Sequence, residues 1–251
     1  MSYCPAHPVS PGVGSIEEGT QTDPLRVLFW LWRVTGKSEY REAALKSAQF
    51  VLGGQKPDGA WPLTVNSQSL KPGGGYGAYS TLNDGTTVWG MKAMLLGWHL
   101  SNDPKYLEAL RKAGQWVVRV QLAGRARGWA EQYRDDGQPA WAREFEPPAA
   151  CLTAVGDAAD ALLLMFDLAG DDRYLAPLRQ CVQWGLAMPE PYKGYLYYDP
   201  ESGEPITAKG YKVIRFSDPA FKSASPYRTS ADFFNRLEAR IQMRAGGPLV
   251  P

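Results

Sequence analysis

The chain has 251 residues, 44% of them apolar, which is enough to bury a substantial core in one globular domain. Its 27 Lys and Arg residues balance 26 Asp and Glu residues, and the formal net charge of +1 argues against nucleic-acid or membrane partners. Three cysteines lack metal-ligand spacing, and two histidines are too few for a zinc site or a convincing triad. Acid–base chemistry must therefore rest on Asp, Glu, Lys, Arg and Tyr.

We expect residues 1–14 to form an irregular polar leader. They contain no charged segment followed by an apolar stretch, so no signal peptide is visible. The longest apolar segments of the chain carry charges such as Arg33 and Asp167 and are too short to span a bilayer. We therefore expect a globular domain over residues 15–226, followed by a C-terminal helix and tail over residues 227–251.

A polar turn that runs into a helix recurs three times at nearly equal intervals, around Tyr40, Tyr106 and Tyr174. An apolar segment of helical length precedes each turn, and these segments cover residues 25–34, 87–100 and 158–169. The pattern predicts three helix pairs, and hence six main helices, around a common core. The expected fold class is all-α, with short strands at most outside the helices.

Long stretches rich in Gly, Pro and aromatic residues follow the second helix of each pair, over residues 53–79, 123–148 and 188–226. Loops of this length are uncommon in compact domains and are usually functional. Because all three leave the same end of their helix pairs, we expect them to form a groove on one face.

Two of the motifs near this face repeat one another. Glu17 and Glu18 precede Gly-Thr and the first helix, and Asn83 and Asp84 precede Gly-Thr and the third. The acidic residues are also favourable neighbours of a helix N-terminus. Their matching positions place carboxylates from two units at one end of the bundle, and hard oxygen ligands of this type suit calcium.

The other two motifs present aromatic residues. Trp61 follows a Pro-Asp-Gly-Ala turn, where it could also pack the loop onto the core. The second motif contains Trp129 and Tyr133, and then Arg143 and Glu146 within Trp-Ala-Arg-Glu-Phe-Glu-Pro-Pro. A guanidinium among aromatic side chains and carboxylates suits a sugar carboxylate, although a structural Arg143–Glu146 pair is an alternative.

These strings, DGAWP, TLNDGTT and WAEQY…QPAWAREFEPP, resemble in order and spacing the helical-toroid pectate lyases of polysaccharide lyase family ten. Members typically carry DNGAT, NGGWPQ, TFND or TLND, and PAWARxFEPP. The resemblance covers residues 16–219. It aligns Glu17 with the first acidic residue of the family, Asp84 with the acidic residue of the ND pair, and Arg143 with the arginine of the AR motif.

The resemblance implies a short α/α toroid of three helix pairs and calcium-dependent β-elimination on polygalacturonate or a related acidic polysaccharide. It implies calcium bound by Glu17 and Asp84. It also implies a secreted or periplasmic monomer that binds neither nucleic acid nor membrane. The residues expected to bind substrate are Arg143, Glu146, Trp61, Asn83, Trp129 and Tyr133.

The chain departs from the family where the catalytic arginines are expected. The family pattern there is ARFYE…NRPxxxxRD, whereas this chain has Leu196 in place of the first arginine and Gly210 in place of the second, the expected base. Lys209 or Arg215 then becomes the expected substitute, unless these are merely exposed loop charges. Two other functions stay open: a noncatalytic relative that binds glycans in the same groove, and an α/α-toroid glycoside hydrolase that uses Glu/Asp pairs.

Overall fold

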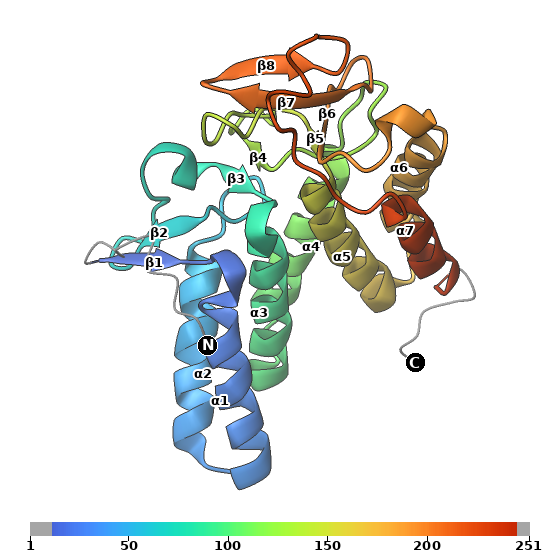
Figure 1. Cartoon of the computed structure of the whole chain (residues 1–251). Coiled ribbons are helices and arrows are strands. Elements are labelled where there is room, and N and C mark those ends of the chain that lie inside the picture. Colours follow the sequence, from blue (N-terminus) through green and yellow to red (C-terminus); the bar gives the residue numbers. More distant parts are fainter. Residues whose placement is uncertain (1–11, 245–251) are drawn as a thin grey trace.

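The computed structural model describes residues 12–244 (Figure 1). The helices expected from the repeated turn are present as three successive pairs, and a further helix packs against the third pair. They are α1 (Thr22–Thr35) with α2 (Ser38–Gly53), α3 (Thr86–Ser101) with α4 (Pro104–Arg119), α5 (Leu152–Ala169) with α6 (Ala176–Leu186), and finally α7 (Phe233–Gln242).

The first helix of each pair ends in the same way. Gly36, Asn102 and Gly170 follow α1, α3 and α5 with φ of 70°, 55° and 64°, and each backbone N–H donates to a carbonyl in the last helical turn. Glycine and asparagine adopt this left-handed conformation more readily than other residues. Asp103 then accepts a hydrogen bond from the Lys105 N–H and caps α4. The recurring polar turn therefore reverses the chain.

The core lies between the helices and extends beneath the segments that join them. Helices α3 and α5 are the most deeply buried, because α1 and α5 both pack against α3, and α4 packs on α3 and α5. Glycines allow close approach here. An added Cβ on Gly90 would lie 2.4 Å from the Trp61 ring, and one on Gly97 would lie 2.6 Å from the Tyr106 ring. The large aromatic side chains thus fill space that the glycines leave open.

The long segments pair with one another in antiparallel strands. Strand β1 (Val13–Ser15) pairs with β2 (Thr64–Asn66), β3 (Ser80–Thr81) pairs with β4 (Gln132–Tyr133), and a four-stranded sheet has the order β5 (Ala150–Cys151), β6 (Tyr197–Tyr198), β7 (Pro205–Lys209) and β8 (Lys212–Arg215). In Figure 1 the β3–β4 pair and the four-stranded sheet lie beyond the upper ends of the helices.

The all-α prediction, and with it the α/α-toroid class, is wrong. About 50% of the residues are helical and 12% are in strands, so the fold is mixed α/β. The segments that were expected to be mostly irregular are partly buried, and their backbone N–H and C=O groups must find partners there. Short runs such as Tyr197–Tyr198 and Pro205–Lys209 meet this need by pairing with one another.

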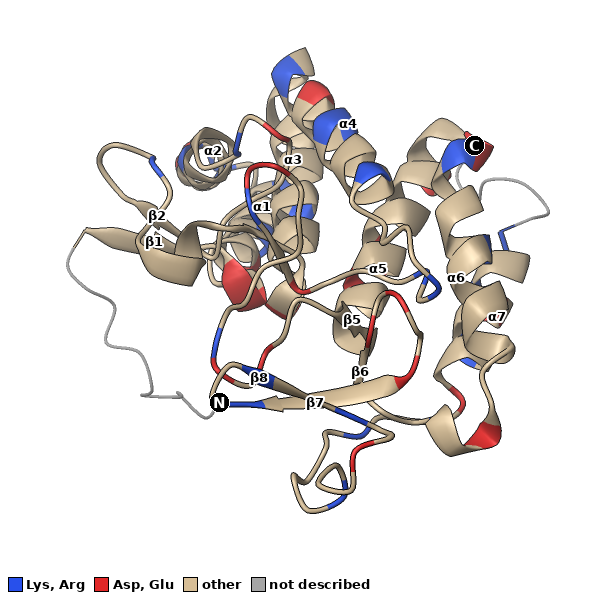
Figure 2. Ribbon diagram, turned by 90° about the horizontal axis from the view of Figure 1, so that it is seen from above, with Lys and Arg blue, Asp and Glu red and all other residues tan. Residues whose placement is uncertain are grey.

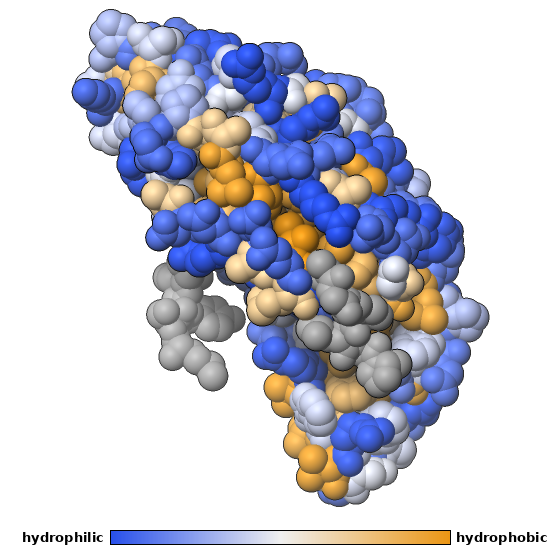
Figure 3. Space-filling view, turned by 90° about the vertical axis from the view of Figure 1, so that its right-hand side faces the viewer, coloured by the Kyte–Doolittle hydropathy of each residue, from blue (hydrophilic) through white to orange (hydrophobic). Residues whose placement is uncertain are grey.

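Charged and apolar residues are distributed differently over the loop end and over one side of the molecule. Figure 2, which looks down on the loop end, shows Asp and Glu interspersed with Lys and Arg along the loops. The face that carries α6 and α7 is mostly hydrophilic, with an apolar strip across its middle (Figure 3). Within residues 12–244, no helix is long and apolar enough to cross a membrane. The domain boundaries given above stay a prediction.

Candidate functional site

Two acidic residues occupy equivalent, unusual backbone positions ahead of α1 and α3. They lie in short 3-10 helices, η1 (Glu17–Gly19) and η3 (Asn83–Gly85). Glu18 has φ 52° and ψ 22°, and Asp84 has φ 54° and ψ 27°. For residues other than glycine this left-handed region costs about 1 kcal/mol or more, so its repetition points to a functional constraint. Both side chains are exposed.

This geometry pairs Glu18, rather than Glu17, with Asp84. Elements η1 and η3 pack against one another. Although the Asp84 residue is accessible to solvent, the surrounding segments partly desolvate its carboxyl, and this raises its pKa; the negative charge of Glu18 raises it further, and the positive charge of Arg143 lowers it. The three side chains therefore share one electrostatic neighbourhood although they come from three separate segments.

Arg143 is held by Glu146 in a bidentate ion pair. One oxygen of the buried Glu146 carboxylate accepts from the Arg143 Nε at 2.8 Å and from its backbone N–H at 3.1 Å. The other oxygen accepts from the Arg143 Nη2. Hydrogen bonding to Glu146 raises the pKa of the arginine, and the guanidinium lies 4.9 Å from the centre of the Phe145 ring.

The Arg143 guanidinium is fixed but still accessible, since 44% of its side chain is exposed. A planar guanidinium has five N–H donors, and Glu146 accepts from only one edge of the group. The remaining donors can meet a second carboxylate. The structural pair and the binding role considered from the sequence are thus compatible, because Glu146 orients the group that would bind.

A buried acid lies behind this pair. Glu131 is only 7% exposed, and its carboxylate oxygen accepts a hydrogen bond from the Tyr197 hydroxyl at 3.0 Å. Burial, followed by the negative charge of Glu146, raises the pKa of Glu131 to about 7. The backbone N–H of Asn83, a residue expected to bind substrate, donates to the Glu131 carbonyl at 3.2 Å. Asn83 itself is largely buried, so it connects η3 to the β4 segment.

Three aromatic residues expected to bind substrate lie in the core instead. Trp61, Trp129 and Tyr133 are fully buried. The two indole N–H groups donate to the carbonyls of Val51 and Val117, at 2.6 Å and 2.8 Å. The Tyr133 hydroxyl accepts from a backbone N–H at 2.6 Å. A substrate-contact role is therefore not supported by their position, and they fasten the long segments to the helices.

The two candidate bases lie at different places on one hairpin. Lys209 is exposed at the end of β7, opposite Lys212 of β8. The tip between them touches the Arg143 segment, because the Tyr211 N–H donates to the Glu144 carbonyl at 3.0 Å and the Tyr211 ring lies 5.5 Å from the Trp141 ring. Lys209 is thus on the hairpin tip that reaches this segment.

Arg215 lies at the other end of the hairpin. Its guanidinium is 3.0 Å from the Asp199 carboxylate and 3.6 Å from that of Glu204. Hydrogen bonding to Asp199 raises the pKa of Arg215, which disfavours the deprotonated form that a base needs. The ion pairs indicate a structural role for this residue.

The donor set suits a hard cation only in part. Asp84 and Glu18 offer carboxylate oxygens at neighbouring turns, and the half-buried Glu17 accepts from the Ser15 hydroxyl at 3.2 Å. In the part of the chain that the structure describes, no three His, Cys, Asp or Glu residues are grouped to hold a metal ion. Calcium takes six to eight oxygen ligands, so water or substrate would have to supply most of them.

Sequence reasoning missed several residues around the site. Aligning the two Gly-Thr pairs would have selected Glu18 in place of Glu17. Glu131 lies inside a quoted motif, but its burial could not be read from the sequence. Exposed aromatic side chains near Arg143 were also missed: Tyr76 adds to the electrostatic environment of Arg143, and Tyr227 lies 6.3 Å from the Phe145 ring. Of the three cysteines and two histidines in the sequence, Cys4 and His7 lie outside the described residues, and Cys151 and Cys181 are buried.

Comparison with known proteins agrees with the resemblance inferred from the motifs. The sequence model of the Pectic acid lyase family matches residues 6–96. No curated protein sequence matches the chain.

Two similar structures come from Cellvibrio cellulosa. A mutant family 10 polysaccharide lyase in complex with trigalacturonic acid has a TM-score of 0.74 and 17% identity, over 92% of this chain and 82% of that one. A family 10 polysaccharide lyase has a TM-score of 0.70 and 18% identity, over 92% and 76%. The resemblance inferred from the motifs is thereby confirmed: residues 6–96 match the Pectic acid lyase model, and the chain has the fold of the family 10 polysaccharide lyases.

Proposed function

We propose that this chain is a polysaccharide lyase that cleaves pectate, or a related acidic polysaccharide, by β-elimination. The observation that carries the proposal is the convergence of the Arg143–Glu146 pair with Asp84 and Glu18. A fixed cation next to acidic side chains suits a polymer that bears one carboxylate on each sugar. The trigalacturonic acid bound by the similar Cellvibrio protein supports an acidic substrate.

Arg143 is the residue that would bind the substrate carboxylate. β-Elimination removes the proton from C5, which is adjacent to this carboxylate, and negative charge develops there as the C4–O bond breaks. Glu146 keeps the guanidinium in one orientation, so little reorganisation is needed when the charge develops. Arginine suits the role because its planar fork matches the two oxygens of a carboxylate.

Asp84, with Glu18 or Glu17, would hold calcium between the protein and the substrate carboxylate. Bound there, calcium would neutralise part of the carboxylate charge and make the C5 proton more acidic. The raised pKa of Asp84, which is caused first by desolvation and then by the charge of Glu18, supports this assignment, because a bound cation would offset both effects.

Lys209 is our candidate for the group that takes the C5 proton. It lies on the hairpin tip that touches the Arg143 segment, and a lysine loses its proton more readily than an arginine does. The proton would move from C5 to the Lys209 Nζ, the C4–C5 double bond would form, and the leaving oxygen would be protonated by solvent. Secretion or export to the periplasm, and action as a monomer, complete the proposal.

A second candidate is a noncatalytic protein that binds acidic glycans at the same site. The substitutions at Leu196 and Gly210, where arginines are expected, favour it, as does the exposure of Lys209. Both candidates require Arg143, but only the lyase forms an unsaturated product.

Calorimetric titration with trigalacturonate, with calcium and then with a chelator, tests the binding shared by both candidates. We expect Arg143→Lys to weaken binding at least about tenfold. Arg179→Lys is the matched control, because the Arg179 side chain is also 44% exposed and also pairs with an acid, Asp172. Equal affinities for the wild type and Arg143→Lys would overturn the assignment.

A further inference from the structure

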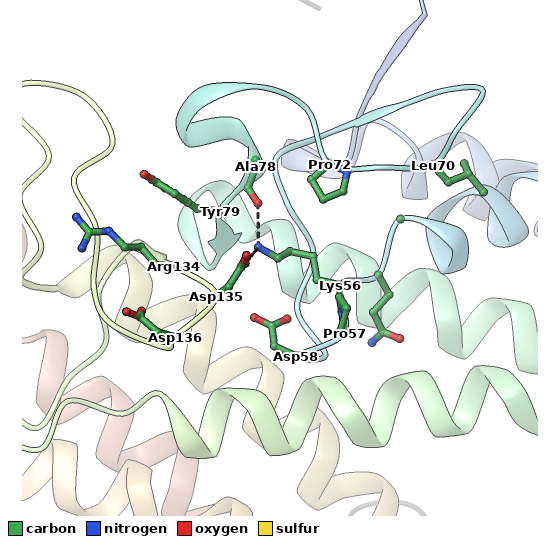
Figure 4. Close-up of a pocket in the computed structure, with 12 residues that line it drawn as sticks. Lys56, Pro57, Asp58, Leu70, Pro72, Ala78, Tyr79, Arg134, Asp135 and Asp136 are labelled. Atoms are coloured by element: carbon green, nitrogen blue, oxygen red, sulfur yellow. Dashed lines mark hydrogen bonds and ion pairs between the residues drawn. The ribbon is translucent and has the colours of Figure 1, made fainter.

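A cavity of about 770 Å³ is lined by neither Arg143 nor Asp84, and its volume is in the range of small-molecule sites. It is bounded by segments 54–58, 70–79 and 134–136 (Figure 4). A second cavity of about 260 Å³ shares Asp58, Asp135 and Asp136 with the first. The two cavities therefore adjoin at these three aspartates and together form a depression.

A buried lysine lies at the centre of this depression. The Lys56 side chain is only 6% exposed, and its ammonium donates to the Asp135 carboxylate at 2.7 Å and to the Ala78 carbonyl at 2.9 Å (Figure 4). An ammonium has three N–H donors, so one remains for a further partner. Asp135 is 89% exposed and lies at the rim, where solvent or a ligand can reach it.

The neighbouring carboxylates are held in place by their own hydrogen bonds. Asp58 accepts from the Ala60 N–H at 3.0 Å and from the Ser80 hydroxyl at 2.5 Å. Asp136 accepts from the Gln138 N–H at 2.9 Å. Each carboxylate has further lone pairs, which can accept hydrogen bonds from a ligand. Their positions are therefore set before any ligand arrives.

Apolar groups form the rest of the lining. Pro57, Leu70 and Pro72 carry no side-chain hydrogen-bonding groups, and the ring of Tyr79 also contributes. The lining thus combines apolar surface with donors and acceptors. This combination is the one expected for a ring that has an apolar face and hydroxyl groups at its edges.

The charges select among ligands. Lys56 and Arg134 are outnumbered by three aspartates, so the lining as a whole repels an anion. A metal ion does not fit either, since no group of three potential ligands suited to a metal occurs among residues 12–244. Hydroxyl groups both donate and accept, and they match the mixture of free donors and acceptors here.

We propose that this depression is a second carbohydrate site, which takes a neutral sugar unit rather than a uronate. It is separate from the proposed lyase site and does not rest on lyase activity. The short helix η2 (Gly75–Ala78) and its flanks connect the two places, because Tyr76 contributes to the environment of Arg143 while Tyr79 lines the cavity.

The test is titration of the full chain with galactotetraose, arabinotetraose and cellotetraose, with trigalacturonate as the acidic comparison. We expect at least one neutral probe to bind with a dissociation constant of about 1 mM or lower. Asp136→Ala and Tyr79→Ala should each weaken that binding about tenfold or more, since each removes a contact group. Glu42→Gln, at an exposed position on α2, is the control that should leave binding unchanged.

Cross-measurement separates this inference from the proposed lyase site. Arg143→Lys should leave neutral-sugar binding intact, and Asp136→Ala should leave trigalacturonate binding intact, with thermal melting used to confirm that both variants fold. Failure of all three neutral probes to bind would overturn the inference, as would neutral binding that both cavity variants retain. Loss of trigalacturonate binding in a folded Asp136→Ala variant would also overturn it, because the depression would then belong to the uronate site.

Discussion

Glu18 and Asp84 adopt the same left-handed backbone conformation, with φ of 52° and 54°, at equivalent turns before α1 and α3. The flanking residues Ile16 and Leu82 are fully buried and anchor both turns. The fold thus presents two acidic side chains, in two copies of one strained turn, next to the fixed guanidinium of Arg143.

Replacing Asp84 by asparagine should weaken substrate binding without lowering the stability of the fold. Asparagine tolerates the left-handed conformation, and the change removes the repulsion by Glu18, so stability to urea should be equal or higher. Trigalacturonate affinity in calcium should fall at least about tenfold, because a charged ligand is lost. Asp172→Asn, at a surface ion pair, is the control. Retained calcium-dependent affinity in Asp84→Asn would contradict the assignment.

The hairpin tip provides a paired test of the base. Lys209→Ala should lower kcat by at least about a hundredfold with little change in trigalacturonate affinity, because the proton acceptor is removed. Lys212 lies opposite Lys209 in β8 and is also exposed, so Lys212→Ala controls for loss of positive charge. Equal reductions in kcat in both variants would point to a general charge effect and remove Lys209 as the base.

Arg215 should contribute to the stability of the fold and not to catalysis. Its ion pairs with Asp199 and Glu204 join β8 to the segment that follows β6. Arg215→Ala leaves the largely buried Asp199 and Glu204 carboxylates without this partner, so the midpoint of urea unfolding should fall while kcat changes little. Steady-state kinetics at a temperature where the variant is fully folded provide the check. A large loss of kcat there would restore Arg215 as a catalytic candidate.

The buried carboxyl of Glu131 should make the folded chain less stable as pH rises. Its pKa is raised from 4.5 to about 7 in the folded chain, so the native state binds the proton more tightly than the unfolded state. The stability from this group is fully present below about pH 4.5, and it is lost as pH rises to about 7 and above.

Glu131→Gln should therefore flatten the stability profile in this window. It should also raise the free energy of unfolding at pH 8 relative to the wild type, by an amount on the order of 1 to 3 kcal/mol. Urea titrations at pH 5 and pH 8 measure the difference. Burial is also the main reason that the pKa of Asp157 is raised to about 7. Asp157 therefore contributes its own pH dependence equally to the wild type and to Glu131→Gln, and the difference between the two proteins reports on Glu131 alone. An unchanged profile in Glu131→Gln would show that the carboxyl is not held protonated.

The helix pairs could be predicted because their signals are local. Apolar spacing and capping residues such as Gly36 and Asp103 act within a few positions of the chain. The strands could not be predicted in the same way, because β3 and β4 are only two residues long and are defined by a partner far away in the sequence. An all-α prediction follows naturally when only local periodicity is visible.

The same distinction between local signals and long-range packing applies to the residues of the site. Asp84, Arg143 and Glu146 could be selected because their residue types stand in recognisable motifs. Trp61 and Trp129 belong to equally recognisable motifs but are buried, and the Trp61 ring fills space that Gly90 leaves open. Motifs thus identify which residues matter, whereas burial decides whether they meet substrate or hold the loops.

The central claim is most directly tested by ultraviolet absorbance of the 4,5-unsaturated uronide during incubation with polygalacturonate, in calcium and in chelator. The account predicts calcium-dependent absorbance that increases with pH, because a base accepts the C5 proton only in its deprotonated form, and that is lost in Arg143→Lys but not in Arg179→Lys. Trigalacturonate binding without any unsaturated product, at every pH and calcium concentration tried, would contradict lyase activity and favour the noncatalytic glycan-binding protein.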